Sequence, residues 1–98
     1  MNLKMIIVSY NAAIDDDLMD VMSAVGMVNF TKFSEVYGKG QTSGIHDGSD
    51  VWPGINNVLL AVVSEEVADR ALEAVRDLRK KLGNEGVKAF ILPVEAVS

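Results

Sequence analysis

The chain contains no cysteine, so disulfide bonds and thiolate metal sites are excluded. It also lacks any apolar run approaching the roughly 20 residues that a membrane-spanning helix needs. The apolar start, residues 1–10, is too short for a secretory signal and has no small-residue cleavage site, so we interpret it as a strand. A cytoplasmic location is therefore expected.

Positive charge is scarce as well. Lysine and arginine number 9 against 14 aspartates and glutamates, which gives a net charge of −5. The one basic run, residues 79–81, falls at the end of a predicted helix, where the helix dipole favours cations. Without a concentrated basic surface, nucleic acid is not expected as the main partner.

Histidine and catalytic patterns are almost absent. The sequence has a single histidine, His46, and no nucleophile-elbow motif, so it does not predict a Ser-His-Asp triad. Paired carboxylates occur only on helix surfaces and in one loop. The sequence therefore gives no reason to expect an enzyme.

The 98 residues suffice for one domain, 1–98, with one modest core. Apolar runs and helical periodicity predict a strand, a helix, two strands, a helix and a strand, over residues 3–10, 14–25, 27–37, 55–63, 64–82 and 87–97. Asn11 and Ser64 are expected to cap the helices, and Pro93 indicates a sheet edge or a strand end. This order predicts an α+β ferredoxin-like βαββαβ fold, with a four-stranded antiparallel sheet and two helices on one face.

Three consecutive aspartates, Asp15, Asp16 and Asp17, open the first predicted helix. Negative charge is favoured in the first turn of a helix, which is a sufficient explanation for them. Adjacent helical residues point in different directions, so the three carboxylates are not expected to form a metal site.

The predicted strands are apolar on both faces. In residues 55–63, one alternating set includes Leu59 and Ala61, and the other includes Leu60 and Val62. Two helices on one side of a sheet cover only one of these faces. We therefore expect the second face to pack against another copy of the chain.

A long segment, 38–54, separates the second and third predicted strands. Loops of more than about 12 residues are uncommon in compact domains and are usually functional or disordered. Its first part, "GKGQTSG", combines flexible glycines with the cation Lys39 and the amide of Gln41, groups suited to phosphate or another oxyanion. A glycine-rich turn that merely leaves a strand is the alternative.

The rest of this segment contains His46, Asp47, Asp50 and Trp52. Histidine beside carboxylates can bind a divalent metal or relay a proton, although the histidine can equally be an exposed loop residue. The indole of Trp52 can pack against the protein or stack on a ligand.

Two stretches resemble the PII-type signal-transduction superfamily: "SEVYGKGQ" at 34–41, followed by a long loop, and "GNEGVKAFIL" at 83–92. The resemblance covers most of the chain. It implies a homotrimer that binds ATP, ADP or AMP as an effector in clefts between subunits, with no further cofactor. It also implies that the long loop, 38–54, docks onto a partner protein such as a transporter or an enzyme.

By the same resemblance, the ligand-binding residues would be Gly38, Lys39, Gly40 and Gln41 at the base of the loop, and Gly83, Gly86 and Lys88 before and within the last strand. The sequence departs from the family pattern by one missing residue between Gly40 and Gln41, by a shortened loop and by the absence of a basic C-terminal segment. These departures predict a divergent PII-like sensor.

Two other hypotheses come from different classes of protein. One is a divalent-metal-binding trimer that resembles the cation-tolerance (CutA-type) proteins, with His46, Asp47 and Asp50 as ligands. The other is an oligomeric effector module similar to amino-acid-binding ferredoxin-like domains.

Overall fold

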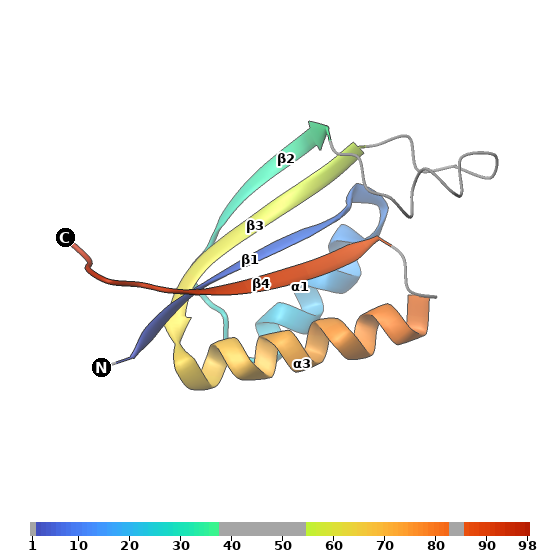
Figure 1. The fold of residues 1–98 in the computed structure, drawn as a ribbon. Coiled ribbons are helices and arrows are strands. Elements are labelled where there is room, and N and C mark those ends of the chain that lie inside the picture. Colours follow the sequence, from blue (N-terminus) through green and yellow to red (C-terminus); the bar gives the residue numbers. More distant parts are fainter. Residues whose placement is uncertain (1, 38–54, 83–85) are drawn as a thin grey trace.

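The structure is a computed structural model and describes residues 2–37, 55–82 and 86–98. Its elements, in chain order, are β1 (Leu3–Asn11), the short 3₁₀ helix η1 (Ala12–Ile14), α1 (Asp15–Ala24), β2 (Thr31–Tyr37), β3 (Ile55–Ser64), α3 (Glu65–Leu82) and β4 (Val87–Pro93). The strands form one sheet in the order β2-β3-β1-β4, with every neighbouring pair antiparallel. Both helices lie on one face of this sheet (Figure 1), which confirms the predicted ferredoxin-like fold.

The second strand starts later than predicted, at Thr31 and not at residue 27. The reason is the way in which α1 ends. Gly26 has a φ of 98°, its N–H donates to the carbonyl of Ser23, and the N–H of Met27 donates to the carbonyl of Met22. This pattern of hydrogen bonds ends a helix through a left-handed glycine. Met27 is buried, so the chain first fills the core and only then begins its strand.

The last strand is shorter than predicted and ends at Pro93 instead of residue 97. Its pairing with β1 finishes at Pro93 opposite Lys4, and one more backbone hydrogen bond, of 3.4 Å, runs from the N–H of Val94 to Leu3. Proline has no N–H to donate to a ladder. Because β4 is also an edge strand, the prediction made from Pro93 is confirmed.

Both predicted capping residues make a cap, although Asn11 caps the short η1 and not α1, whose own N-cap residue, Ile14, makes no side-chain hydrogen bond. The side chain of Asn11 accepts a hydrogen bond of 2.8 Å from the N–H of Ala13, and the Ser64 hydroxyl accepts one of 3.2 Å from the N–H of Val67. Each cap satisfies an N–H group that has no partner within its helix. They fix the points at which β1 and β3 turn into helices.

The core lies between the sheet and the helices. The strands contribute Ile6, Val8 and Leu59, all fully buried, and the helices contribute Leu18 and Val75. No helix within 2–37, 55–82 and 86–98 is long and apolar enough to cross a membrane.

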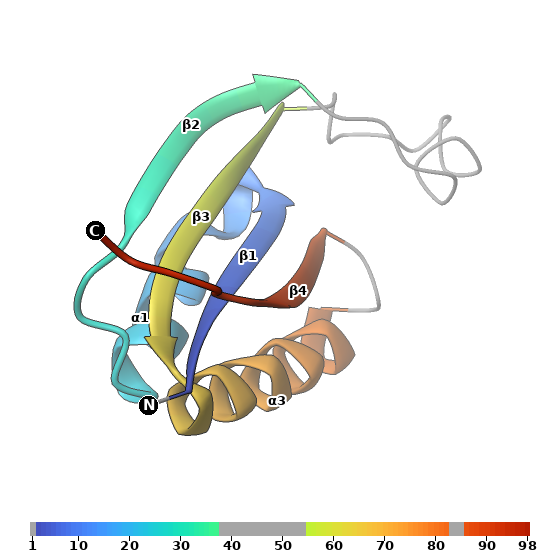
Figure 2. The same ribbon diagram turned by 60° about the vertical axis from the view of Figure 1, so that its left-hand side comes forward.

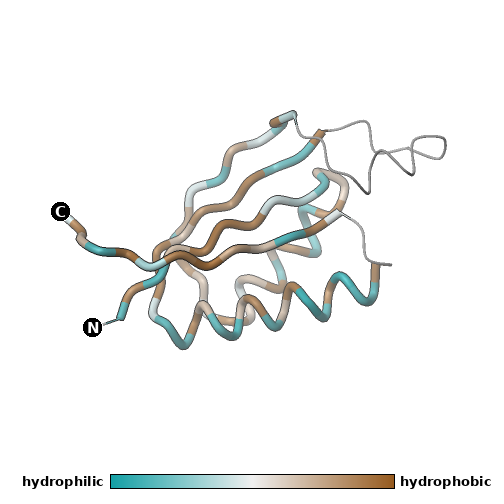
Figure 3. Tube along the Cα trace, in the orientation of Figure 1, coloured by the Kyte–Doolittle hydropathy of each residue, from teal (hydrophilic) through white to brown (hydrophobic). Residues whose placement is uncertain are grey.

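The opposite face of the sheet, which we call the open face, also bears apolar side chains. Much of β1, β3 and β4 is hydrophobic along the chain (Figure 3). On the open face, Phe33, Val62, Phe90 and Leu92 are 50%, 45%, 50% and 41% exposed. They come from the alternate positions of β2, β3 and β4, as the two-faced apolar pattern predicted. Extended apolar surface of this kind is typical of an interaction surface.

Candidate effector site

Of the residues predicted to bind a ligand, the structure describes two, Gly86 and Lys88. The remaining predicted residues lie outside the described ranges: Gly38, Lys39, Gly40, Gln41 and Gly83 for the ligand, and His46, Asp47, Asp50 and Trp52 for the loop. The site is therefore built from the elements that flank these segments.

The two glycine-rich segments begin and end at the same end of the sheet. Segment 38–54 runs from the end of β2 to the start of β3, where Tyr37 pairs with Ile55. Segment 83–85 runs from the end of α3 to Gly86, just before β4 starts opposite Tyr10. The register of β1 with β3 and β4 places all these points at one end (Figures 1 and 2).

Within one chain, however, these segments start from opposite edges of the sheet. The order β2-β3-β1-β4 places β2 at one edge and β4 at the other. Neighbouring strands lie about 4.8 Å apart, so three spacings separate β2 from β4 by about 14 Å. The end of β2 and the start of β4 thus lie at one end of the sheet but at its opposite edges.

Gly86 has a backbone conformation that favours glycine, with a φ of 83°. Its carbonyl accepts a hydrogen bond of 2.7 Å from the N–H of Asn11. A Cβ at this position would lie 3.4 Å from the Cβ of Asn11, which is close to ordinary contact. Conformation, more than lack of space, therefore requires glycine here.

Lys88 is exposed on β4, opposite Ser9 of β1. It lies two residues from Gly86 and on the same face of the strand as Phe90. Its ammonium group is therefore at the site end of the sheet and on the open face, where it can contact an anion or a second chain.

A polar cluster under the end of β2 was not predicted as a unit. Asp15, at the first turn of α1, accepts hydrogen bonds from three strands: 2.5 Å from the Tyr10 hydroxyl, 3.2 Å from the Asn57 amide, and 3.1 Å and 3.2 Å from the Lys32 ammonium. Asn57 completes the cluster by accepting a hydrogen bond of 3.0 Å from the N–H of Glu35. We call these residues the Asp15 cluster.

The electrostatics of the cluster follow from these contacts. The hydrogen bond from Tyr10 lowers the pKa of the Asp15 carboxyl, with Lys32 and Asn57 acting in the same direction against partial burial. Burial raises the pKa of the Tyr10 phenol well above its ordinary value of 10.0, and the hydrogen bond to Asp15 raises it further. The cluster therefore contains a carboxylate and a neutral phenol at physiological pH.

Glu35 has a φ of 57°, the left-handed region that residues with a Cβ rarely adopt. It lies in an irregularity of the β2–β3 ladder between Phe33 and Val36. Such a bulge inserts a residue into one strand and bends it. The last residues of β2 are thereby redirected just before the strand ends at Tyr37.

Sequence reasoning assigned Asp15 only a role in the helix dipole, and it missed the cluster. A usable signal was present: Tyr10, Lys32 and Asn57 occupy positions of three strands that face the helices, where apolar residues are the rule. Buried polar groups need partners, so polar residues on the covered face of neighbouring strands indicate a shared network.

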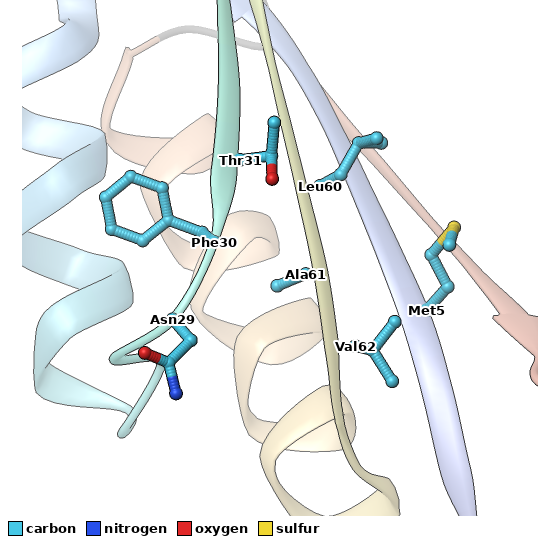
Figure 4. Close-up of a pocket in the computed structure, with 7 residues that line it drawn as sticks. All are labelled: Met5, Asn29, Phe30, Thr31, Leu60, Ala61 and Val62. Carbon is cyan, nitrogen blue, oxygen red and sulfur yellow. The ribbon is translucent and has the colours of Figure 1, made fainter. Parts of the chain in front are cut away.

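A pocket of about 400 Å³ opens beside the start of β2 (Figure 4). Its lining residues are Met5, Asn29, Phe30, Thr31, Leu60, Ala61 and Val62. Its lining includes no charged side chain that could bind a phosphate. Val62 is seven residues from Ile55 along β3, about 23 Å at the usual rise, so the pocket is remote from the glycine-rich end.

Among the residues that the structure describes, no group of three histidine, cysteine, aspartate or glutamate side chains could hold a metal ion. The ligands of the cation-tolerance hypothesis, His46, Asp47 and Asp50, lie outside these residues. That hypothesis stays untested.

Solved structures show the same fold. A PII-like signaling protein from Thermus thermophilus matches with a TM-score of 0.69 and 23% identity, over 96% of this chain and 87% of that one. CPII from Thiomonas intermedia, bound to ADP, AMP and acetate, matches with a TM-score of 0.74 and 16% identity, over 99% and 90% of the two chains. GlnK of B. subtilis, in complex with ATP, gives 0.66 and 17%, over 96% and 84%.

No curated protein sequence matches the chain. The family model of nitrogen regulatory protein P-II, in contrast, matches residues 3–98, nearly the whole sequence. This match confirms the PII-like resemblance drawn from the residues at 34–41 and 83–92. The chain belongs to the nitrogen regulatory protein P-II family.

Proposed function

We propose that the protein is a small-molecule sensor that binds an adenine nucleotide in clefts between the subunits of a homotrimer. It regulates a partner protein, such as a transporter or an enzyme, through the loop 38–54. In this proposal residues 1–98 form one cytoplasmic domain that is not an enzyme and requires no cofactor. The observation that carries the proposal is that the strands flanking segments 38–54 and 83–85 meet these segments at one end of the sheet, with β2 and β4 at its opposite edges.

Within one chain, the strand ends that flank the two segments lie at opposite edges of the sheet. Hydrogen bonds to phosphate oxygens span about 3 Å, whereas the edges β2 and β4 are about 14 Å apart. If the β2 edge of one chain lies beside the β4 edge of the next, the two segments face each other. Contact between two different edges is a heterologous interface, which forms a ring such as a trimer when the rotation between neighbouring chains closes.

The open face supports the same assembly. With Phe33, Val62, Phe90 and Leu92 partly exposed, the sheet has a second apolar surface to bury. Packing the open faces around a shared axis would bury them and would also bring the strand edges of neighbouring chains together. The apolar open face and a site shared between two chains thus favour the same trimer.

In this arrangement each cleft would combine residues of two chains. Gly38, Lys39, Gly40 and Gln41 come from one chain, and Gly83, Gly86 and Lys88 from its neighbour. Glycine backbone lets N–H groups approach phosphate oxygens closely, and the two ammonium groups supply positive charge. The ligands of two structural neighbours, ADP and AMP for CPII and ATP for GlnK, support the choice of an adenine nucleotide.

Titration calorimetry of the purified oligomer with ATP, ADP and AMP tests the proposal. The parent protein is expected to bind at least one of them, and Lys88→Gln is expected to weaken binding because it removes a cation from the cleft. Lys4→Gln is the matched control, since Lys4 pairs with Pro93 at the other end of the sheet. Absence of heat for all three nucleotides at millimolar concentration would refute the nucleotide proposal.

The loop's role needs a separate test. A variant that lacks residues 42–52 is expected to remain a trimer and to bind nucleotide through the retained residues 38–41. A partner protein that cross-links to the parent, in a nucleotide-dependent way, should no longer cross-link to this variant. Retention of the partner by the shortened chain would assign docking to another surface.

A further inference from the structure

We infer that Asp15 and Asn57 are positioning residues for the effector cleft, because they hold the bulge at Glu35 that aims the last residues of β2. This inference deepens the proposed function and rests on it for the ligand. Neither residue is expected to touch the nucleotide. They act through the backbone of Glu35, three residues before Gly38.

Asn57 uses both ends of its side chain. It is only 6% exposed, its Nδ2 donates to Asp15 over 3.2 Å, and its Oδ1 accepts from the N–H of Glu35 over 3.0 Å. When this buried amide presents its oxygen to Glu35, its NH₂ group points the other way and is stabilised by an acceptor there. The Asp15 carboxylate is that acceptor, so it determines which way the amide is turned.

Asp15 is itself held from three directions. The Tyr10 hydroxyl approaches from β1, the Lys32 ammonium from β2 and the Asn57 amide from β3, while Asp15 belongs to α1. Charge-assisted hydrogen bonds of this kind are stronger than neutral ones. Contacts among four elements therefore fix the side-chain amide of Asn57, and this amide holds the backbone N–H of Glu35.

That N–H belongs to the residue on which the direction of β2 depends. Before the bulge, Phe33 pairs with Val58, and after it Val36 pairs with Asn56. Side chains alternate between the faces of a strand, so the extra residue decides which face Val36 and Tyr37 occupy. Because Glu35 bears a side chain at a φ of 57°, this conformation needs support from outside the strand.

The effect on the cleft follows from continuity of the chain. Tyr37 is the residue before Gly38, so the path of Val36 and Tyr37 sets where residues 38–41 begin. If the bulge slips, Tyr37 exchanges faces and the ligand-binding backbone starts from another direction. The proposed cleft would then lose affinity, although no ligand contact had been mutated.

Amide hydrogen exchange and backbone chemical shifts test the positioning step directly. In Asn57→Ala, exchange at Glu35 is expected to accelerate by about fivefold or more, the factor that corresponds to one hydrogen bond. The shifts of Val36 and Tyr37 should move with it. In Asp15→Asn the same residues should respond, whereas Asp17→Asn, an exposed change in the same turn of α1, should leave them unchanged.

A rescue variant separates positioning from general stability. Glycine adopts a positive φ without help, so Asn57→Ala with Glu35→Gly should recover the parent shifts at Val36 and Tyr37. Nucleotide affinity, measured by calorimetry on folded protein, should fall by about fivefold in Asn57→Ala and return in the double variant. A merely structural role would weaken both variants alike.

Two outcomes are decisive. If Asn57→Ala and Asp15→Asn leave the exchange of Glu35 and the shifts of Val36 and Tyr37 unchanged, the inference is wrong. If the parent binds no nucleotide, the proposed function fails, and the exchange and shift data still decide whether these residues position the end of β2.

Discussion

Replacing Phe90 with alanine removes apolar surface from the open face without touching the core. Phe90 is 50% exposed and pairs with Ile7 in the middle of the β1–β4 ladder. If the open faces pack together in a trimer, the exposed half of this ring becomes buried at the interface. The substitution should therefore weaken assembly and leave the fold of the single chain intact.

The magnitude follows from the exposed area. A phenylalanine buries about 200 Å² when fully covered, so half of it corresponds to about 100 Å². At about 25 cal/mol per Å², each subunit loses about 2.5 kcal/mol of association free energy. Since about 1.4 kcal/mol is a factor of ten, this amounts to about 60-fold per subunit. The concentration at which the oligomer dissociates should rise accordingly.

Sedimentation over a range of protein concentrations measures this shift, and circular dichroism checks that the secondary structure is kept. Val28→Ala is the matched control, because Val28 is 79% exposed but lies between α1 and β2, outside the sheet. Phe90→Glu should dissociate the oligomer further, since it would bury a charge at the interface. If Phe90→Ala and Val28→Ala assemble like the parent protein, the open face is not the interface.

Three further predictions concern single groups. Gly86→Ala should lower the free energy of unfolding by about 1–2 kcal/mol, measured by urea denaturation at fixed protein concentration, because a φ of 83° disfavours a side chain. The pKa of Asp15 is lower in the folded protein than its ordinary value of 3.8. The ionised carboxylate therefore stabilises the fold above pH 3.8, and this stabilisation is lost as the pH falls through the folded pKa. Asp15→Asn should flatten this acid part of the pH–stability curve. The pKa of Tyr10 is raised in the folded protein. In Tyr37→Phe, Tyr10 is the remaining tyrosine, and near-ultraviolet absorbance should show its phenol still protonated above pH 10.0. The free energy of unfolding should decline as the pH rises past that value. A Tyr10 phenol that ionises at its ordinary pKa would contradict both its burial and its hydrogen bond to Asp15.

The order of elements was predictable because it depends on local signals. Helical periodicity, the caps Asn11 and Ser64, and the glycine at 26 are each read within a few residues. Their combination leaves few topologies, and the observed order of elements and strands agrees with the predicted one. The apolar open face was also predictable, since alternation along β3 is visible without knowledge of its partners.

The Asp15 cluster was not predictable in the same way. Tyr10, Lys32 and Asn57 are far apart in sequence, and they meet Asp15 only because the strand register places them side by side. Dipole stabilisation already explained an aspartate at that position, so nothing in the local sequence demanded a second role. The bulge at Glu35 was hidden for the same reason, because its left-handed residue is neither glycine nor asparagine.

A cleft shared by two chains couples ligand binding to assembly, and this coupling distinguishes it from a pocket within one chain. A ligand that binds only the assembled form stabilises that form by mass action, about 2.7 kcal/mol at a concentration of about 100 Kd. The coupling is reciprocal, so whatever weakens assembly must weaken the apparent affinity for the ligand. Phe33→Ala, on the open face of β2, should therefore reduce nucleotide affinity at low protein concentration and recover it at high concentration. A site confined to one chain would show no such dependence, because its ligand contacts would all survive dissociation.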